Sequence, residues 1–373
     1  MDNRKKILIN ASTVKISGGL YIALDLISYL VSSPDIKTKI ICPSIRPFQR
    51  FREKTEVQHV PEIFFHYILR PFLDYWWLKK QINAYNADLV VSLSNLPART
   101  GKKQIFFHDN AFMSIPDFRN LNLSLKSRFI HHARRFVFRQ RIRFIDHLVV
   151  QSELEKERLI QLYGSGLPIL IFPPLLPSHL KNNISIIKFN GISKNRILIG
   201  CLSRYFEHKN IEILSEAALM CKKQNLPYQF IITVDPSMGK RARHLLSRIS
   251  ELKLSDFMIN AGKIKRKNIS AFMRSIDALI LPSLIESYSL NYIESWFHRK
   301  PLFVADKDFS RKICKSDALY FQLSDPASII HALQKYFNHT EHYTQMLNEG
   351  EKRVMRLPKP HELIKTLLIL SES

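Results

Sequence analysis

Short apolar segments alternate with helical stretches along most of the chain, and this alternation restricts the fold more strongly than any other sequence feature. The apolar segments have the length of buried strands, and the stretches between them are long enough for helices. Such alternation is typical of a parallel sheet with helices packed on its faces. We therefore predict an α/β fold. The first five expected strands are residues 6–10, 38–42, 88–93, 104–108 and 146–150.

A proline-rich segment divides this alternation into two series. Residues 170–177 read LIFPPLLP and precede a stretch rich in Lys and Asn, a composition that favours an irregular connection. We therefore expect two Rossmann-like halves of similar size. The expected domains are residues 1–172, a linker at 173–195, residues 196–345 and a helical tail at 346–373. The expected strands of the second half are residues 196–202, 228–234, 257–260, 278–281 and 301–305.

The charge of the chain indicates an anionic partner. Its net charge is +24, which favours binding to nucleic acid, anionic lipid or phosphorylated substrates. The four cysteines are scattered, so neither a disulfide framework nor a zinc site is expected, and a reducing cytoplasm fits best. We expect no signal peptide, because the charged N-terminus runs directly into a strand. No apolar run approaches about 20 residues, so no membrane span is expected.

Residues 279–301 combine a helix start with two carboxylates. An apolar strand ends at Pro282, a polar turn follows, and a helix is expected from about Leu290. Free N–H groups at a helix start attract phosphate. Glu286 and Glu294 lie on either side of that start and would repel phosphate, but carboxylates accept hydrogen bonds from sugar hydroxyls. This combination indicates a nucleotide-sugar site.

Two cations follow the strand expected at 196–202. Arg204 and Lys209 lie in the loop before the next helix, at the edge of the sheet where a diphosphate would need neutralising. Alone, such a pair is more often solvated than bound to a ligand. Together with the helix start at Ser289 and Leu290, it favours a diphosphate site.

The first half offers two further candidate contacts. Gly18 and Gly19 are expected in a loop between the first strand and a helix that begins at Leu20, where glycine lets the backbone approach a phosphate. His108 and Asp109 end the strand at 104–108, at the sheet edge where ligands bind. The alternatives are an ordinary tight turn for the glycines, and a capping Asp beside an incidental His.

Residues 119–143 are strongly basic and much of the segment is expected to be helical. They contain eight Lys or Arg and no acidic residue, interleaved with Phe and Ile. A basic helix that carries aromatic residues is typical of binding to an anionic membrane surface, or of attraction to a phosphate-bearing acceptor. A solvated helix face is the alternative. We favour the membrane because the basic residues have no acidic neighbours.

Taken together, these elements resemble the retaining, two-Rossmann-domain (GT-B) glycosyltransferases of glycosyltransferase family 4. In that fold the two domains face each other across a cleft, and a C-terminal helix can pack back on the N-terminal domain. The matching segments span most of the chain in the family's order. They are SGGL (17–20), DHLVVQSELEKERL (146–159), PP (173–174), GCLSRYFEHKN (200–210) and PSLIESYSLNYIESWFHRKP (282–301).

The resemblance implies a role for each matching residue. Arg204 and Lys209 would hold the donor diphosphate and stabilise the leaving group. Glu286 would bind hydroxyls of the donor sugar, and Glu294 those of the ribose. The other implied donor contacts are the backbone N–H groups of Ser289 and Leu290, the Gly18–Gly19 pair closing on the diphosphate, and His108 beside the transferred sugar.

Two positions depart from the family pattern. The turn after Glu286 is usually rich in glycine, whereas here it contains Tyr288, which is expected to shape the sugar pocket. Residues 234–237 read VDPS where the family usually has a turn with glycine, on the side that binds the base.

The implied activity is transfer of a sugar from a nucleotide diphosphate sugar, with retention and without a metal or other cofactor. The expected acceptor is a glycan, lipid-linked, in surface polysaccharide or lipopolysaccharide synthesis at the inner face of the cytoplasmic membrane. A nucleotide-sugar epimerase or hydrolase of GT-B shape is the main alternative. A basic nucleic-acid-binding protein is less favoured, because no recognition-helix, zinc or RNP signature occurs; no nucleic-acid partner is expected.

Overall fold

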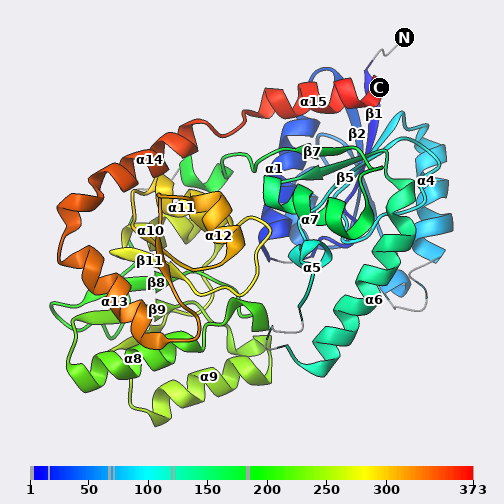
Figure 1. Cartoon of the computed structure of the whole chain (residues 1–373). Helices are drawn as coiled ribbons and strands as arrows, with labels where there is room; N and C mark the ends of the chain where they lie inside the picture. Colours follow the sequence, from blue (N-terminus) through cyan, green and yellow to red (C-terminus); the bar gives the residue numbers. More distant parts are fainter. Residues whose placement is uncertain are drawn as a thin grey trace. The chain divides into compact units, whose positions relative to one another are not determined.

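The computed structural model describes residues 4–15, 17–65, 69, 72–118, 121, 123–181 and 185–372. The chain forms two compact units. Unit 1 comprises residues 1–118, 124–177 and 358–373, and unit 2 comprises residues 119–123 and 178–357. Each unit is built on a parallel sheet with helices packed around it (Figure 1). The predicted fold class, two Rossmann-like α/β halves, is confirmed.

Unit 1 contains a seven-stranded parallel sheet. Its strand order is β3-β2-β1-β4-β5-β6-β7, so β1 is an interior strand, with β2 on one side and β4 on the other. The chain therefore reverses its direction of winding between β1 and β4. The strands are β1 Lys5–Asn10, β2 Ile36–Cys42, β3 Glu56–His59, β4 Leu89–Ser92, β5 Gln104–Phe107, β6 His147–Val150 and β7 Ile169–Ile171.

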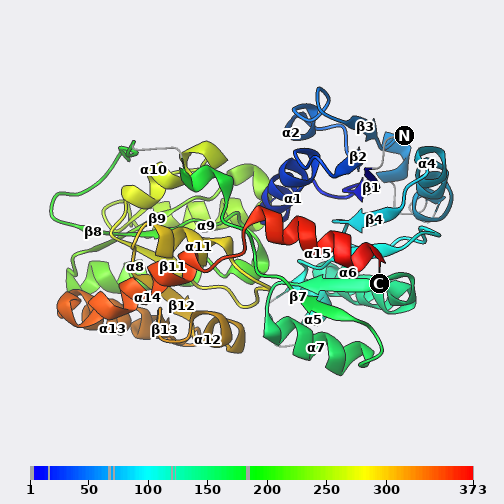
Figure 2. The ribbon, with the colours of Figure 1, turned by 90° about the horizontal axis from the view of Figure 1, so that it is seen from above.

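The alternation of side chains along β1 explains how this sheet is covered. Ile7 and Ile9 point to one face, where they share a core with α1 (Ser17–Val31) and with Leu363 and Leu367 of α15 (Pro360–Glu372). Leu8 points to the other face and packs with α4 (Leu78–Tyr85). Figure 2 shows α15, in red, against unit 1. The C-terminal helix thus returns to the N-terminal half, as predicted.

The remaining helices of unit 1 follow the carboxyl ends of β5 and β6 or connect the strands. Asn110 caps α5 by accepting a hydrogen bond from the N–H of Phe112, and Ser152 caps α7 in the same way through the N–H of Glu155. The helical elements of unit 1 other than α1, α4 and α15 are α2 Arg46–Gln49, η1 Glu62–Phe65, η2 Leu73–Trp77 (a π-helix), α5 Ala111–Ser114, α6 Leu125–Arg141, η3 Ile142–Phe144 and α7 Glu153–Tyr163.

Unit 2 contains a six-stranded parallel sheet in the order β10-β9-β8-β11-β12-β13. Its central strands are continuous apolar runs because helices cover both faces. All four residues of β11 are buried. The strands are β8 Ile197–Cys201, β9 Tyr228–Ile232, β10 Met258–Asn260, β11 Ala278–Leu281, β12 Leu302–Ala305 and β13 Leu319–Phe321.

Helices alternate with these strands along the chain, and short 3-10 turns precede several of them. The helix α14 belongs to unit 2, so only α15 of the expected tail lies in unit 1. The helical elements of unit 2 are η4 Ser178–Lys181, η5 Glu207–Lys209, α8 Ile213–Gln224, η6 Pro236–Met238, α9 Lys240–Glu251, η7 Arg266–Asn268, α10 Ile269–Arg274, α11 Leu290–Phe297, α12 Asp308–Cys314, α13 Pro326–Phe337, η8 Thr340–Tyr343 and α14 Thr344–Met355.

Two local expectations were wrong, and two elements were not predicted. Residues 170 and 171 are part of β7 rather than of an irregular segment, because they pair with β6. The strand β13 and the helix α12 were not predicted. The helix α1 begins at Ser17, so Gly18 and Gly19 lie in its first turn and not in a loop before it. Within the described residues, no helix is long and apolar enough to cross a membrane.

Candidate functional site

In unit 2 the predicted site residues gather where the winding of the sheet reverses. From β8 the chain continues to β9 and β10 on one side, and it then crosses to β11 on the other side of β8. In open α/β sheets, ligands bind beyond the carboxyl ends of the two strands at such a point. Arg204 and Lys209 follow β8, and Glu286 and Ser289 follow β11. The fold therefore brings together two loops that are about eighty residues apart in the sequence.

The loop after β8 presents Arg204 as a cation with spare hydrogen-bonding capacity. Thr233 ties this loop to β9, since its hydroxyl accepts from the N–H of Ser203 at 3.0 Å. The guanidinium carbon of Arg204 lies 5.8 Å from the ring centroid of Phe206. Its Nε is buried and has no hydrogen-bond partner among the described residues. A half-buried cation with an unused donor is suited to an anionic ligand.

Lys209 and Glu286 form an ion pair across the two loops. The Nζ of Lys209 donates to Oε1 of Glu286, and these side chains are only 19% and 11% exposed. The hydroxyl of Ser283 donates to the same carboxylate oxygen at 2.7 Å. The loops are also joined through their backbones, because the N–H of Leu284 donates to the carbonyl of His208 at 2.8 Å. The two predicted catalytic side chains are thus held together.

The helix start predicted at Leu290 is present. Ser289 precedes α11 in an extended conformation, and within the described residues its side chain makes no capping hydrogen bond. The first N–H groups of α11 therefore receive no hydrogen bond from the side chain of Ser289. Asn291 anchors this end of the helix, since its amide donates to the carbonyl of Leu202 at 2.6 Å. The helix start lies beside the loop that carries Arg204.

Glu294 is placed differently from its neighbours, because its side chain is buried. His179 of η4 lies 3.0 Å from it, between Nε2 and Oε1, and both side chains are at most 4% exposed. The other carboxylate oxygen, Oε2, is buried and has no hydrogen-bond partner in the described part of the chain. Arg266 in turn donates from Nε to Nδ1 of His179 at 3.2 Å.

Tyr288 is half-buried, and its ring packs against α11. Its ring centroid is 6.2 Å from that of Tyr292, a fully buried residue of α11. Burial raises the pKa of the Tyr288 phenol, and the nearby Cys314 adds to this effect. Part of the side chain is thus in contact with α11, and its role in shaping a sugar pocket stays a prediction.

In unit 1 the structure brings Gly19 and Asp109 together. A Cβ at residue 19 would overlap Oδ2 of Asp109, whereas a Cβ at residue 18 would meet nothing within 4 Å. Burial raises the pKa of Asp109 to about 6. The half-buried carboxyl group therefore lies beside the first turn of α1, at the carboxyl edge of the sheet. Gly19 is required for this close approach, and Gly18 is not.

His108 is almost completely buried. Its Nε2 lies 3.8 Å from Oε1 of Glu155 on α7, and its ring centroid is 5.7 Å from that of Phe138. Burial lowers the pKa of His108 to about 4, so the imidazole is neutral at pH 7. Burial raises the pKa of Glu155 to about 8, with a further contribution from the charge of Asp109. The structure thus surrounds His108 with protein groups, and no sequence motif indicated Glu155.

The basic segment 119–143 separates into structural and exposed residues. Arg119 lies outside the described residues. Arg141 is buried and pairs with Asp74 at 2.5 Å, and Arg135 donates to the carbonyls of Pro116 and Phe112 at 3.0 and 2.8 Å. Lys126, Arg139 and Arg143 are exposed. Part of the positive charge therefore stabilises the fold of unit 1.

The helix α6 also exposes large apolar side chains. Leu125, Phe129 and Phe136 are 85%, 75% and 66% exposed. At 100° per residue these three positions lie within about 40° of one another around the helix. We call them the α6 apolar stripe. A stripe of this kind beside exposed cations is typical of a helix that lies in a membrane interface.

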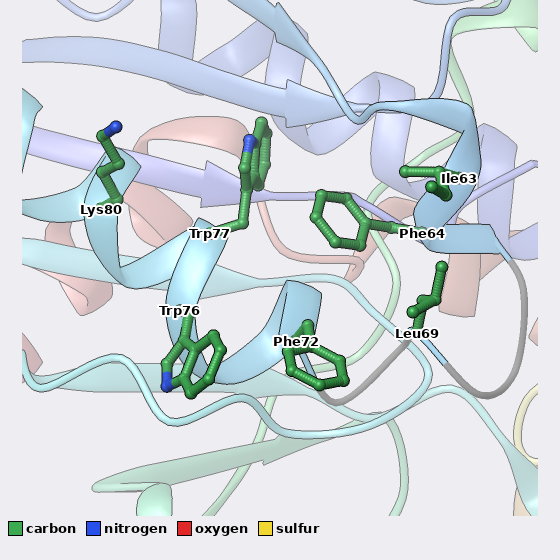
Figure 3. A pocket seen from close by; sticks show the side chains of 7 residues that line it. All are labelled: Ile63, Phe64, Leu69, Phe72, Trp76, Trp77 and Lys80. Atoms are coloured by element: carbon green, nitrogen blue, oxygen red, sulfur yellow. The ribbon is translucent and has the colours of Figure 1, made fainter.

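A separate apolar groove lies elsewhere in unit 1 (Figure 3). It has a volume of about 460 Å³. Trp76 at its edge is 69% exposed and packs edge-on against Phe72, with ring centroids 5.1 Å apart. An apolar lining is unsuited to a diphosphate, so we do not assign the donor to this groove. Its lining residues are Ile63, Phe64, Leu69, Phe72, Trp76, Trp77 and Lys80.

One group of side chains in the described ranges has the ligand spacing of a metal site. His339, Glu341 and His342 are exposed around η8, with ligand atoms within 4.8 Å of one another. Exposed groups of this kind are common without an ion, and we assign them no metal role.

Comparison with known proteins relates unit 2 to a family of transferases. Residues 182–353 match the family described as glycosyl transferases group 1. EpsF of Bacillus subtilis (strain 168), which is named as a glycosyltransferase, is 25% identical over 181 residues. The match covers 48% of this chain and 44% of EpsF, so the chain spans less than half the length of this curated relative.

Solved structures match nearly the whole chain. Sucrose-phosphate synthase from Thermosynechococcus elongatus has a TM-score of 0.73 and 14% identity, over 99% of this chain and 98% of that one. Anabaena Alr3699/HepE in complex with UDP and glucose has a TM-score of 0.71 and 13% identity, over 98% and 99%. WaaG, a glycosyltransferase involved in lipopolysaccharide biosynthesis, has a TM-score of 0.70 and 12% identity, over 96% and 98%.

The structural similarities identify the fold. The fold is that of GT-B glycosyltransferases. The sequence match to glycosyl transferases group 1 lies within unit 2.

Sequence reasoning missed the partners of the predicted residues. Ser283 lies three residues before Glu286, and this spacing could have suggested that the two side chains are in contact. His179 lies in the segment expected to be a linker, and no motif marks it.

Proposed function

We propose that this protein is a retaining glycosyltransferase of family 4 type that uses a nucleotide diphosphate sugar as donor. The observation that carries the proposal is the grouping of Arg204, Lys209 and Glu286 with the start of α11 at one sheet reversal. Two cations and a helix start suit a diphosphate, and a carboxylate beside them suits sugar hydroxyls. The complex of Anabaena Alr3699/HepE with UDP and glucose is consistent with such a donor.

The residues take separate roles in this proposal. Arg204 and Lys209 neutralise the diphosphate as it leaves, and the N–H groups of Ser289 and Leu290 bind its distal phosphate. Glu286 accepts hydrogen bonds from the donor sugar. Glu286 accepts a hydrogen bond from Lys209, so the donor phosphate competes with this carboxylate for the amine. The ion pair keeps both side chains in place until the donor arrives.

We propose that transfer occurs on one face of the sugar. The bond between the anomeric carbon and the phosphate oxygen breaks, and the acceptor oxygen bonds to the same face of that carbon. The acceptor proton passes to the leaving phosphate oxygen. In this proposal the charge on the leaving group is stabilised by Arg204, Lys209 and the dipole of α11, without a metal ion or other cofactor.

We propose further that the acceptor is a lipid-linked glycan and that the protein lies on the inner face of the cytoplasmic membrane. The α6 apolar stripe, beside the exposed Lys126 and Arg139, supports a membrane-facing surface. The exposed Trp76 at the apolar groove supports it too, since tryptophan favours membrane interfaces. Synthesis of a surface polysaccharide or lipopolysaccharide would use such an acceptor.

A nucleotide-sugar epimerase or hydrolase is the second candidate. It would use the same donor residues but would release an epimer or a free sugar when no acceptor is present. A product assay with the donor alone distinguishes these enzymes from a transferase.

The experiment that tests the proposal has two stages. Thermal unfolding is first followed with a panel of nucleoside diphosphates, because a ligand at a hundredfold excess over its dissociation constant stabilises the fold by about 2.7 kcal/mol. Transfer from the matching nucleotide sugar to membrane lipid extract is then measured for the wild type, Lys209→Ala and Glu286→Ala. Both variants should fold and lose transfer. Turnover like that of the wild type in either one contradicts the proposed roles.

A further inference from the structure

Glu294 belongs to a chain of three side chains that connects it to the first element of unit 2. Arg266 donates from Nε to Nδ1 of His179 at 3.2 Å, and Nε2 of His179 lies 3.0 Å from Oε1 of Glu294. All three residues lie in unit 2.

The geometry determines where the imidazole proton lies. A nitrogen that accepts from a guanidinium must offer its lone pair, so Nδ1 of His179 carries no hydrogen. The hydrogen of the neutral ring is then on Nε2, where it is donated to the carboxylate of Glu294. His179 therefore acts as a donor to Glu294, and Arg266 selects the form of the ring that can do so.

The position of the ring is itself well supported. The hydroxyl of Ser270 on α10 donates to the carbonyl of His179 at 3.4 Å, and Leu180, the next residue of η4, is 2% exposed. Ser178 accepts from Arg266 at 3.3 Å. The element η4 is thus attached on both sides of His179, which restricts the rotation of the imidazole.

The two carboxylate oxygens of Glu294 therefore differ in their hydrogen bonding. Oε1 is occupied by His179, whereas Oε2 is buried and has no hydrogen-bond partner among the residues that the structure describes. A buried carboxylate oxygen without a donor is costly, and a hydroxyl group would relieve that cost. A pair of ribose hydroxyls offers such donors.

We propose that His179 and Arg266 are positioning residues for the recognition of ribose. His179 holds Glu294 through Oε1 so that Oε2 is available to a ribose hydroxyl of the donor nucleotide. This inference rests on the proposed function, because it requires a nucleotide donor. It adds one consequence to that proposal. Without His179, the protein distinguishes less well between a nucleotide that carries ribose and the analogue that lacks the 2′ and 3′ hydroxyls.

The test compares the affinity for a nucleoside diphosphate with that for its 2′,3′-dideoxy analogue, measured by calorimetry on the full chain. The nucleotide is the best ligand among UDP, GDP, ADP and CDP in the thermal screen. A hydrogen bond to a charged group corresponds to a preference of at least about tenfold for the ribose form in the wild type. His179→Leu should bring the two affinities within about twofold and leave the affinity for the dideoxy analogue unchanged.

Two further variants separate positioning from folding. His179→Gln retains an N–H donor near the position of Nε2 and should keep most of the preference. His331→Gln changes an exposed histidine on α13 and should behave as the wild type. If His179→Leu does not fold, the tautomer of His179 in the wild type is determined by ¹⁵N NMR at pH 7, with His179→Gln to assign the signal. The neutral ring protonated at Nε2 is expected.

Each contrary result has a distinct meaning. An unchanged preference in His179→Leu, an equal loss of both affinities, or a ring protonated at Nδ1 overturns the positioning role. If the wild type binds the nucleoside diphosphate and its dideoxy analogue equally, the positioning role is also overturned, while the proposed function stands. If the wild type binds none of the four nucleoside diphosphates, the proposed function fails and this inference fails with it.

Discussion

Asp109 lies so close to Gly19 that a Cβ at residue 19 would overlap its carboxylate oxygen. The two residues are ninety positions apart in the sequence. Their contact joins the first turn of α1 to the carboxyl end of β5, on the edge of the sheet where the winding of unit 1 reverses. A Cβ at the adjacent Gly18 would meet no atom within 4 Å. Residue 19 therefore has no room for a larger side chain, whereas residue 18 does.

This difference predicts opposite effects of two matched variants. Gly19→Ala must displace Asp109, so we expect it to destabilise unit 1 by about 1–3 kcal/mol. Gly18→Ala fills open space in a helix, and we expect it to stabilise the fold by about 0.5–1 kcal/mol. Chemical denaturation of both variants checks this. Equal stability of the two would contradict the packing described for residue 19.

The buried Glu155 predicts a specific dependence of stability on pH. Its pKa is about 8 in the folded protein, well above the ordinary value, so the folded state holds a proton that the unfolded state has lost. Stability should therefore fall as the pH rises from about 6.5 to about 8. Asp109, with a pKa of about 6, and His108, with a pKa of about 4, contribute mainly below this range.

The variant Glu155→Gln removes this titration. The difference in melting temperature between pH 6.5 and pH 8 should be smaller in Glu155→Gln than in the wild type. The matched control Glu157→Gln, on the same helix, should keep the dependence of the wild type. An identical pH profile for the wild type and Glu155→Gln would show that Glu155 is ionised in the folded protein throughout the range.

Binding to anionic vesicles should depend on two sets of residues of α6. The double variant Phe129→Gln/Phe136→Gln removes most of the apolar stripe, and Lys126→Gln/Arg139→Gln removes two exposed cations. Each basic residue near an anionic surface contributes about 1 kcal/mol, so the second variant should bind roughly thirtyfold more weakly at low salt. Co-sedimentation with phosphatidylglycerol vesicles measures this. If the wild type does not bind even at low salt, the membrane proposal is wrong.

Tyr288 provides a test of the sugar-pocket prediction. Because Tyr288→Phe keeps the ring that packs against Tyr292, it should leave the preference among donor sugars unchanged. Tyr288→Ala should destabilise the fold by about 3–5 kcal/mol, by analogy with other large aromatic truncations. Competition between nucleotide sugars, measured by product analysis, checks the first statement. A changed preference in Tyr288→Phe would support the sugar-pocket interpretation.

The sequence was sufficient for the fold because the central strands are continuous apolar runs. Residues 278–281 are buried on both faces and cannot be confused with a surface segment. The shorter β13 was missed because three residues, LYF, carry no clear period. The start of α1 was placed too late because the glycines resembled a loop, whereas the helix extends through them.

The candidate site was predictable only in part. Arg204, Lys209 and Glu286 could be identified because they follow strands, and the structure brings them together at neighbouring strand ends. Pairings over long sequence separations could not be identified. His179 reaches Glu294 over 115 positions, and neither residue type specifies the other as a partner. Burial could not be predicted either: His108 was expected to contact the substrate, and its side chain is almost completely buried.

The most direct test of the central claim is the contribution of Arg204 to binding of the diphosphate. Calorimetry should compare a nucleoside diphosphate with the corresponding nucleoside monophosphate, for the wild type, Arg204→Met and the control Arg248→Met on the surface of α9. Our account predicts that Arg204→Met loses at least about tenfold in affinity for the diphosphate and little for the monophosphate, while Arg248→Met binds as the wild type. Equal affinity of Arg204→Met and the wild type for the diphosphate would contradict it.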